Sequence, residues 1–309
     1  SVEVPINNLG TSLALGVTTL GYKFPIEDVY YRQAGGGYTF GDLTKRDAFS
    51  VGVKQRLFAA GYEVYGVDDL SGGFMENVSQ KKFFTKLDLR DRVKTNDYIN
   101  KLKPDIIFHL AADATEGRSQ FTPFSALDRN LVAYTNLLVP AIKNGLKKMI
   151  LTSSMSVYGA QQVPFKESMT PMPEDIYGIS KSSMEQTTRV LSKVYGFKYV
   201  TIRPHNVYGP RQNLTDPYRN VIGIFINRLL HGKNFYVYGD GNQKRAFSYV
   251  DDVIPAMINS AFEPKCEGSV INIGSDDPIT LNYLGQVVLE EFFQGKNLSA
   301  KLGPKHFPD

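Results

Sequence analysis

Ile106-Ile107-Phe108-His109-Leu110-Ala111 is a short apolar run with two β-branched residues, and it predicts a buried strand. Similar runs recur along the chain, separated by segments with the apolar spacing of helices. The predicted strands are residues 64–67, 83–87, 106–111, 149–153 and 199–203, and two of the predicted helices are residues 125–144 and 176–195. This alternation predicts an α/β fold, with a parallel sheet and crossover helices.

The character of the sequence changes after Pro204, where loops, glycines and aromatic residues replace the regular alternation. Two further helices are predicted, at residues 221–230 and 281–293. We therefore divide the chain into a Rossmann-type, doubly wound NAD-binding domain at residues 1–204, in which residues 1–50 are atypical, and a smaller C-terminal lobe at residues 205–309. The second part is expected mainly to bind substrate, and it can interleave with the first.

The composition limits the partners of the protein. The 309 residues carry a formal net charge of +4, with 42% hydrophobic and 21% charged residues, which is ordinary for a globular protein. A protein that binds nucleic acid would show a basic stripe with a reading motif, and this chain shows neither. We therefore expect a small anionic molecule as the partner, and no nucleic acid.

The cysteine and histidine content points to a protein without disulfides or metal. Cys266 is the single cysteine, which excludes an intramolecular disulfide and favours a reducing cytoplasm. The four histidines show no metal-ligand spacing, so no metal site is predicted. Residues 9–20 are apolar but too short to cross a bilayer and lack preceding basic residues, so neither a membrane span nor a cleaved signal peptide is expected.

Ser154, Tyr177 and Lys181 form the most informative group of polar residues. Tyr177 and Lys181 are four residues apart, so on a helix their side chains share one face. A free tyrosine has a pKa of about 10, and bringing it to ~7 requires roughly 4 kcal/mol of preference for phenolate. A neighbouring ammonium and an oxidised nicotinamide, both positive, can supply this preference. Ser154 would then bond the substrate oxygen while Tyr177 takes its proton.

One Tyr-x-x-x-Lys pair is also expected by chance in a chain of this composition, so the setting decides its meaning. Further motifs occur in a fixed order between residues 61 and 276. They are Val67-Asp68-Asp69-Leu70-Ser71, residues 104–112, residues 152–159 with Ser154, Tyr177 with Lys181, residues 203–212, Gly239-Asp240-Gly241 with Arg245, and Tyr249-Val250-Asp251-Asp252. In this order they resemble the extended short-chain dehydrogenase/reductases, specifically the nucleotide-sugar epimerase/dehydratase branch of the UDP-glucose 4-epimerase type.

The resemblance implies NAD as the cofactor and assigns residues to it. Asp68 would hold the adenosine ribose and repel the 2′-phosphate of NADP, although an aspartate at this position can also simply cap a turn. Tyr177 and Lys181 would contact the nicotinamide half as well as act in catalysis. The remaining predicted cofactor contacts are Asp88 and Leu89 beside the adenine, and Leu110, Ala111 and Ala112 along the cofactor path.

The resemblance also assigns the substrate contacts. Ser154 would touch the sugar, while Asn206 and Arg245 would hold the nucleotide diphosphate, a task suited to the planar guanidinium. The alternative for Arg245 is a solvated surface arginine. Asn130 would support the geometry of its helix. Members of the family often form homodimers by pairing the helices near residues 125–143 and 177–195, so a homodimer is expected.

The N-terminal part departs from the family pattern. The family's G-x-x-G-x-x-G loop would fall on Thr44, Asp47 and Ser50, none of which is glycine, and Asp47 would bring a negative charge near the pyrophosphate. Residues 35–41 (GGGYTFG) can replace this loop, with residues 28–32 as the preceding strand and residues 43–60 as the helix. The alternatives are a different cap at residues 1–50, or weak or absent NAD binding. The tail that usually follows the family's last strand-helix unit is also missing, so substrate contacts would be lost.

The residues after Ser154 select the reaction within the family. The 4,6-dehydratases carry Asp-Glu there and the UDP-glucuronate decarboxylases carry Glu, whereas this chain has Met155 and Ser156. Epimerases acting at carbon 3 or 5 need an extra acid-base pair, and Cys266 lies far along the chain. We therefore predict C4 epimerisation of a UDP-hexose. The alternatives are a decarboxylase or reductase of the same family, and a non-catalytic sugar-nucleotide-binding protein with impaired NAD binding.

Overall fold

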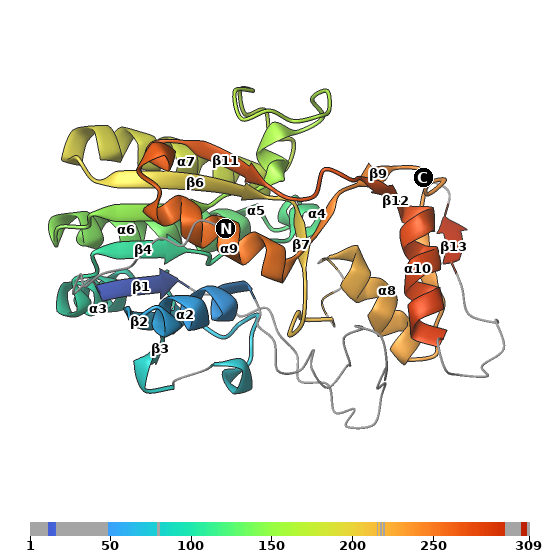
Figure 1. The fold of residues 1–309 in the computed structure, drawn as a ribbon, viewed down its shortest axis with the longest axis horizontal. Coiled ribbons are helices and arrows are strands. Elements are labelled where there is room, and N and C mark those ends of the chain that lie inside the picture. Colours follow the sequence, from blue (N-terminus) through green and yellow to red (C-terminus); the bar gives the residue numbers. More distant parts are fainter. Residues whose placement is uncertain are drawn as a thin grey trace.

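The structure is a computed structural model that describes residues 12–16, 49–78, 81–214, 216, 218, 220–293 and 304–307. These residues form a large α/β body and a smaller lobe beside it, at the right of Figure 1. Within these ranges, no helix is both long and apolar enough to cross a membrane.

In the part of the chain that the structure describes, the body is built on a sheet of seven parallel strands. From one edge to the other the strands are β11 (Val270–Ile273), β6 (Lys198–Pro204), β5 (Lys148–Thr152), β4 (Ile106–His109), β1 (Ser12–Gly16), β2 (Glu63–Asp68) and β3 (Phe84–Lys86). The order reverses between β1 and β4, which makes this a doubly wound, Rossmann-type sheet. Ligands bind such sheets beyond the carboxyl ends of the strands at the point of reversal.

Helices cover both faces of the sheet (Figure 1). One face packs against α2 (Phe49–Ala59) and α9 (Val250–Phe262), and the other against α3 (Arg92–Leu102), α6 (Ala133–Lys143) and α7 (Ile176–Tyr195). Successive side chains of β4 enter opposite cores: Phe108 packs with α2 and α9, and Ile107 packs with α3, α6 and α7. Burial on both faces explains why the first three residues of this strand are all apolar.

The ends of α7 follow from its capping residues. The Asp175 side chain accepts a hydrogen bond from the Gly178 amide at 2.7 Å, and Gly196 closes the helix in the left-handed region with φ of 80°. The predicted helix at residues 125–144 is instead divided into α5 (Pro123–Leu127), a π-helical turn (Asp128–Val132) and α6. Such turns widen a helix locally and occur often at functional sites.

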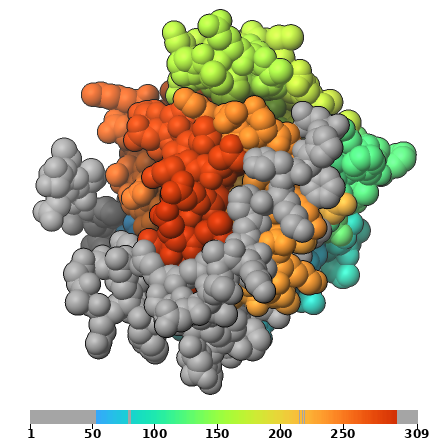
Figure 2. Space-filling view, turned by 90° about the vertical axis from the view of Figure 1, so that its right-hand side faces the viewer, coloured from blue at the N-terminus to red at the C-terminus, as the bar shows by residue number. Residues whose placement is uncertain are grey.

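The smaller lobe has its own apolar core, in which Phe225 stacks on Phe235 with ring centroids 4.0 Å apart. It contains α8 (Val221–Leu230), β8 (Phe235–Tyr238), α10 (Leu281–Phe293) and β13 (Pro304–Phe307), the last strand running parallel to β8. The red surface near the centre of Figure 2 belongs to α10. Two short strand pairs complete this part of the chain, namely β7 (Asn206–Tyr208) with β10 (Phe247–Tyr249), and β9 (Lys244–Arg245) with β12 (Ile279–Thr280). Phe247 and Ile279 pack against the core of the lobe.

The first strand of the sheet is not where the sequence suggested. β1 (Ser12–Gly16) occupies the slot between β2 and β4, within the apolar stretch at residues 9–20. The strand predicted at residues 28–32 and the glycines of residues 35–41 lie outside the described residues. Of the helix predicted at residues 43–60, the structure describes α2 from Phe49 onward.

Candidate active site

A cavity of about 400 Å³ opens at the carboxyl ends of β2, β3 and β4. Most of the predicted cofactor residues line it, namely Asp68, Asp88, Leu89, Ala111 and Ala112. Leu110, Tyr177 and Lys181, which were also predicted to contact the cofactor, are not among its lining residues. The Leu110 side chain is buried in the core beneath α2 and α9. The alternation of side chains after β4 accounts for the difference, because neighbouring residues point to opposite sides.

Asp68 is the last residue of β2, and its side chain is 4% exposed. Its Oδ1 accepts a hydrogen bond from the Leu70 amide at 2.5 Å, and Leu70 has a φ of 61°. The carboxylate therefore caps the turn, as one interpretation of the sequence held, and it also lines the cavity. These two positions are compatible because a carboxylate has four lone-pair sites.

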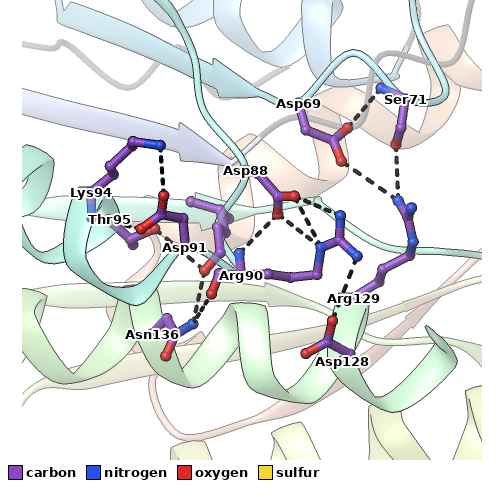
Figure 3. Close-up of polar contacts among 11 residues, drawn as sticks. Asp69, Ser71, Asp88, Arg90, Asp91, Lys94, Thr95, Asp128, Arg129 and Asn136 are labelled. Carbon is purple, nitrogen blue, oxygen red and sulfur yellow. Dashed lines mark hydrogen bonds and ion pairs between the residues drawn. The ribbon is translucent and has the colours of Figure 1, made fainter. Parts of the chain in front are cut away.

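Three arginines line the same cavity, namely Arg90, Arg118 and Arg129. Figure 3 shows Arg90 and Arg129 beside carboxylates. Arg90 forms a two-pronged contact with Asp88, with Nη2 2.6 Å from Oδ2, and Arg129 lies 3.6 Å from Asp69. Hydrogen bonding from Arg90 lowers the pKa of Asp88. Neither Arg90 nor Arg129 was predicted from the sequence, although Arg90 stands only two residues after Asp88. One wall of the cavity therefore carries carboxylates that are paired with arginines.

Ser154, Tyr177 and Lys181 come from two neighbouring elements. Ser154 directly follows β5 and caps a 3₁₀ turn (Met155–Tyr158), with its Oγ accepting from the Ser156 amide at 3.1 Å. Tyr177 and Lys181 occupy the first turns of α7. The Lys181 Nζ lies 5.8 Å from the centre of the Tyr177 ring and donates to the Thr152 carbonyl at 2.7 Å. The predicted pair is thus a pair in space as well as in sequence.

The Lys181 ammonium is 1% exposed, and this burial dominates its titration. Desolvation lowers the pKa of Lys181 to about 7, and the negative charge of Glu185 acts against this lowering. Lys181 therefore titrates close to neutral pH. A cation that close to the Tyr177 ring can stabilise a phenolate, which is the requirement for a tyrosine base at this pH.

The predicted nucleotide contacts lie on the side of the lobe. The Asn206 Nδ2 donates to the Ala246 carbonyl at 2.8 Å, which ties β7 to the residue after Arg245. Arg245 is exposed on β9. Its charge reaches the short helix α4 (Glu116–Ser119), where desolvation and then Asp175 raise the pKa of Glu116 while Arg245 opposes them. The Arg245 Nη1 itself donates to the Lys244 carbonyl at 2.9 Å.

The tie between α4 and α7 is a feature that the sequence did not reveal. The Ser119 Oγ accepts a hydrogen bond from the Tyr177 amide at 3.2 Å and donates to the Glu116 carbonyl at 2.6 Å. Asn130, which the sequence placed in a supporting role, accepts from the Asp113 amide at 2.8 Å through its Oδ1. Asn130 therefore connects the π-helical turn, in which it lies, to the segment that follows β4.

Residues 52–274 of the chain match the family described as NAD dependent epimerase/dehydratase. The chain belongs to this family. It is 36% identical over 229 residues to a UDP-glucose 4-epimerase of Mycolicibacterium smegmatis, covering 71% of this chain and 72% of that protein. It is also 31% identical to a UDP-N-acetyl-α-D-glucosaminuronate decarboxylase of Bacillus cytotoxicus, covering 80% and 77% of the two chains.

A solved structure shows the same fold. The UDP-glucose 4-epimerase of Thermotoga maritima, crystallised with UDP-glucose, superposes with a TM-score of 0.78 at 28% identity, over 96% of this chain and 85% of the other. The family assignment establishes an NAD-dependent nucleotide-sugar enzyme family and confirms the predicted resemblance. It leaves the particular sugar and reaction to be decided by the site.

The cavity fits the adenosine half of NAD. A buried carboxylate at the end of β2 suits the ribose hydroxyls, and Leu89, Ala111 and Ala112 provide apolar walls for a flat base. The positions that the family's glycine loop would occupy, Thr44 and Asp47, lie outside the described residues, as does the rest of residues 17–48. Ser50 falls within α2.

Proposed function

We propose that this protein is an NAD-dependent 4-epimerase of a nucleotide-linked hexose, of the UDP-glucose/UDP-galactose type. The observation that carries the proposal is the contact of Lys181 with both the Tyr177 ring and the Thr152 carbonyl, two residues before Ser154. No acid stands at the two positions that follow Ser154. Met155 and Ser156 offer neither the acid pair of a dehydratase nor the glutamate of a decarboxylase. Proton transfer at one hydroxyl is the chemistry that these three side chains can perform.

In this proposal, Tyr177 takes the proton from the C4 hydroxyl and returns it later, while Lys181 stabilises the phenolate. Ser154 donates a hydrogen bond to the same sugar oxygen and holds it in line with Tyr177. NAD, when bound, supplies the chemistry of accepting a hydride and giving it back at C4. Asn206 and Arg245 anchor the nucleotide from the lobe, so that the 4-keto sugar can present its other face without leaving.

The products of the reaction test this proposal. UDP-galactose incubated with the purified protein and catalytic NAD should yield UDP-glucose, with no net NADH and no carbon dioxide. Carbon dioxide from a UDP-uronate would instead indicate a decarboxylase, which the Bacillus cytotoxicus relative makes the second candidate. Lasting NADH would indicate a reductase or dehydrogenase. Tight nucleotide-sugar binding with no conversion would indicate a binding protein.

The proposed contact between Asp68 and the adenosine ribose can be tested by measuring dinucleotide binding alone, without an activity assay. Asp68→Asn should weaken NAD binding about tenfold or more, because a charge-assisted hydrogen bond contributes about 1.5–3 kcal/mol. It should also narrow the preference for NAD over NADP. Calorimetric titration with both dinucleotides measures this. Asp105→Asn is the control, because Asp105 precedes β4 at the opposite end of the sheet, where it pairs with Lys147 at 2.9 Å. Unchanged NAD affinity in Asp68→Asn would contradict the assignment.

We also propose that the protein forms a homodimer through the exposed faces of α6 and α7. Val139 of α6 and Val190 and Val194 of α7 are 43%, 47% and 66% exposed, and an apolar face of this kind favours a second copy. Val139→Glu with Val190→Glu should convert a dimer to a monomer in light scattering after gel filtration. Val93→Glu, on α3 at 71% exposure, should leave it unchanged. A monomeric unmodified protein would contradict the proposal.

A cytoplasmic location, expected from the single Cys266, stays a prediction that cell fractionation can test.

A further inference from the structure

A buried carboxylate lies one helical turn beyond Lys181 on α7. Glu185 is 6% exposed, and three hydrogen bonds reach it. The Ser153 hydroxyl donates to its Oε1, the Arg203 Nε donates to the same oxygen at 2.9 Å, and the Arg203 Nη2 donates to Oε2 at 2.6 Å. None of the catalytic steps described above uses this group.

The partners of Glu185 connect it to the proton-transfer site. Ser153 stands between Thr152, whose carbonyl accepts from Lys181, and Ser154, the proposed sugar contact. The end of β5 is therefore tied to α7 at two successive residues, through Lys181 and through Glu185. Ser154 follows the second tie directly, so its position depends on both.

Arg203 fixes the other side of the carboxylate. It belongs to β6, the neighbour of β5 in the sheet, and its guanidinium lies 4.6 Å from the centre of the Tyr158 ring. The Tyr158 hydroxyl in turn donates to the Asn272 Oδ1 at 2.9 Å on β11. Glu185 thus connects the helix with the base to three adjacent strands of the sheet.

We propose that Glu185 is a positioning residue for proton transfer, which holds the end of β5 against α7 so that Ser154 stays in register with Tyr177 and Lys181. This inference rests on the proposed function of the site. Glu185 touches neither cofactor nor sugar in this account, and it acts through Ser153 and Lys181. An error of about 1 Å in such a register can cost roughly a hundredfold in rate.

The charge of Glu185 gives the same residue a second effect. The ionisable groups around Lys181 are Tyr177 and Glu185 on α7, His109 on β4 beneath it, and Arg203 on β6 behind Glu185. Burial, and then Lys181, lowers the pKa of His109 to about 3, so His109 is neutral at working pH. Glu185 therefore supplies the negative charge that favours the protonated form of Lys181.

Two variants separate position from charge. Ser153→Ala removes the bond to β5 and leaves the carboxylate, whereas Glu185→Gln keeps an acceptor of the same shape and removes the charge. Thr188→Val is the matched control. It deletes another buried hydroxyl of α7, whose hydrogen bonds among the described residues go to the Tyr134 hydroxyl and the Met184 carbonyl and not to β5.

Ser153→Ala should lower kcat by about tenfold or more, while KM for the nucleotide sugar stays within about twofold, because alignment and not binding is lost. In Glu185→Gln, the alkaline limb of kcat should move to lower pH. The sign follows from linkage: without the nearby anion Lys181 loses its proton at lower pH, and activity that needs the ammonium ends there. Thr188→Val should change neither the rate nor the pH profile.

A second measurement keeps this inference separate from the proposed reaction. The ultraviolet absorbance of phenolate is followed against pH, and the signal of the same protein carrying Tyr177→Phe is subtracted. Removing a negative charge favours the release of both protons of the Tyr177–Lys181 pair, so the Tyr177 signal should appear at lower pH in Glu185→Gln and stay unchanged in Thr188→Val.

The outcomes distinguish the two proposals. If the wild-type protein shows no epimerase activity but Glu185→Gln still shifts the Tyr177 titration to lower pH, the proposed function is overturned and the role of Glu185 is supported. Normal epimerase activity with wild-type kcat in Ser153→Ala and a wild-type pH profile in Glu185→Gln would overturn the role of Glu185. Equal losses of rate in Ser153→Ala and Thr188→Val would show a merely structural contribution and overturn it as well.

Discussion

Tyr177→Phe should lower kcat for C4 epimerisation by roughly a hundred- to ten-thousandfold, because it removes the group that carries the proton. Tyr177 is 6% exposed, and phenylalanine differs from it only by the hydroxyl, so phenylalanine should fill the same space. Affinity for NAD and for UDP should stay within about twofold, since binding does not depend on proton transfer. Steady-state kinetics and calorimetric titration of the same preparation measure both quantities.

Tyr195→Phe is the control for this loss of activity. Tyr195 lies at the last turn of α7 and is 63% exposed, far along the helix from the proton-transfer pair. It should retain full activity. Activity of Tyr177→Phe near that of the unmodified protein would show that another group carries the proton. The role assigned to the Tyr177–Lys181 pair would then be wrong.

Arg203→Leu should have the largest effect on stability, lowering the free energy of unfolding by about 3–5 kcal/mol. Arg203 and Glu185 are 2% and 6% exposed and lie 2.6 Å apart, so the replacement leaves a carboxylate buried without its counter-charge. Urea denaturation followed by circular dichroism measures the change. The expected cause is desolvation of the remaining charge, rather than the loss of a favourable pair alone.

Arg56→Leu is the matched control, because Arg56 also forms an ion pair, with Asp251 at 3.0 Å. The two side chains are 41% and 29% exposed, so water can replace the lost partner, and the change should stay below about 1 kcal/mol. Equal, small losses of unfolding free energy in Arg203→Leu and Arg56→Leu would show that burial of an ion pair does not determine the cost of breaking it.

Local pattern was enough to predict most of the sheet and its helices. Residues 106–111 and 149–153 are apolar runs, and they contain the observed strands β4 (Ile106–His109) and most of β5 (Lys148–Thr152). The helix predicted at 176–195 was confirmed at both ends, and the structure shows that Asp175 and Gly196 cap it. β1 was not predicted as a strand, because its apolar stretch shows no local feature that assigns it to the slot between β2 and β4.

The candidate site was predictable where one motif contains the interacting residues. Tyr177 and Lys181 are four residues apart on one helix, so their proximity follows from helix geometry alone. Arg129 meets Asp69, and Glu185 meets Arg203, only after distant segments pack together. No periodicity signals such contacts, which is why the charged wall of the cavity and the buried tie behind the base came from the structure.

The route of the chain decides how this molecule can be dissected. After leaving for the lobe at β7, it comes back to contribute α9 and the edge strand β11, which pairs with β6. A shortened protein ending at residue 204 would therefore lack one edge of its sheet and the cover over Val200 and Ile202. Recombinant fragments cut there would aggregate through the bared edge, and the two halves have to be made together.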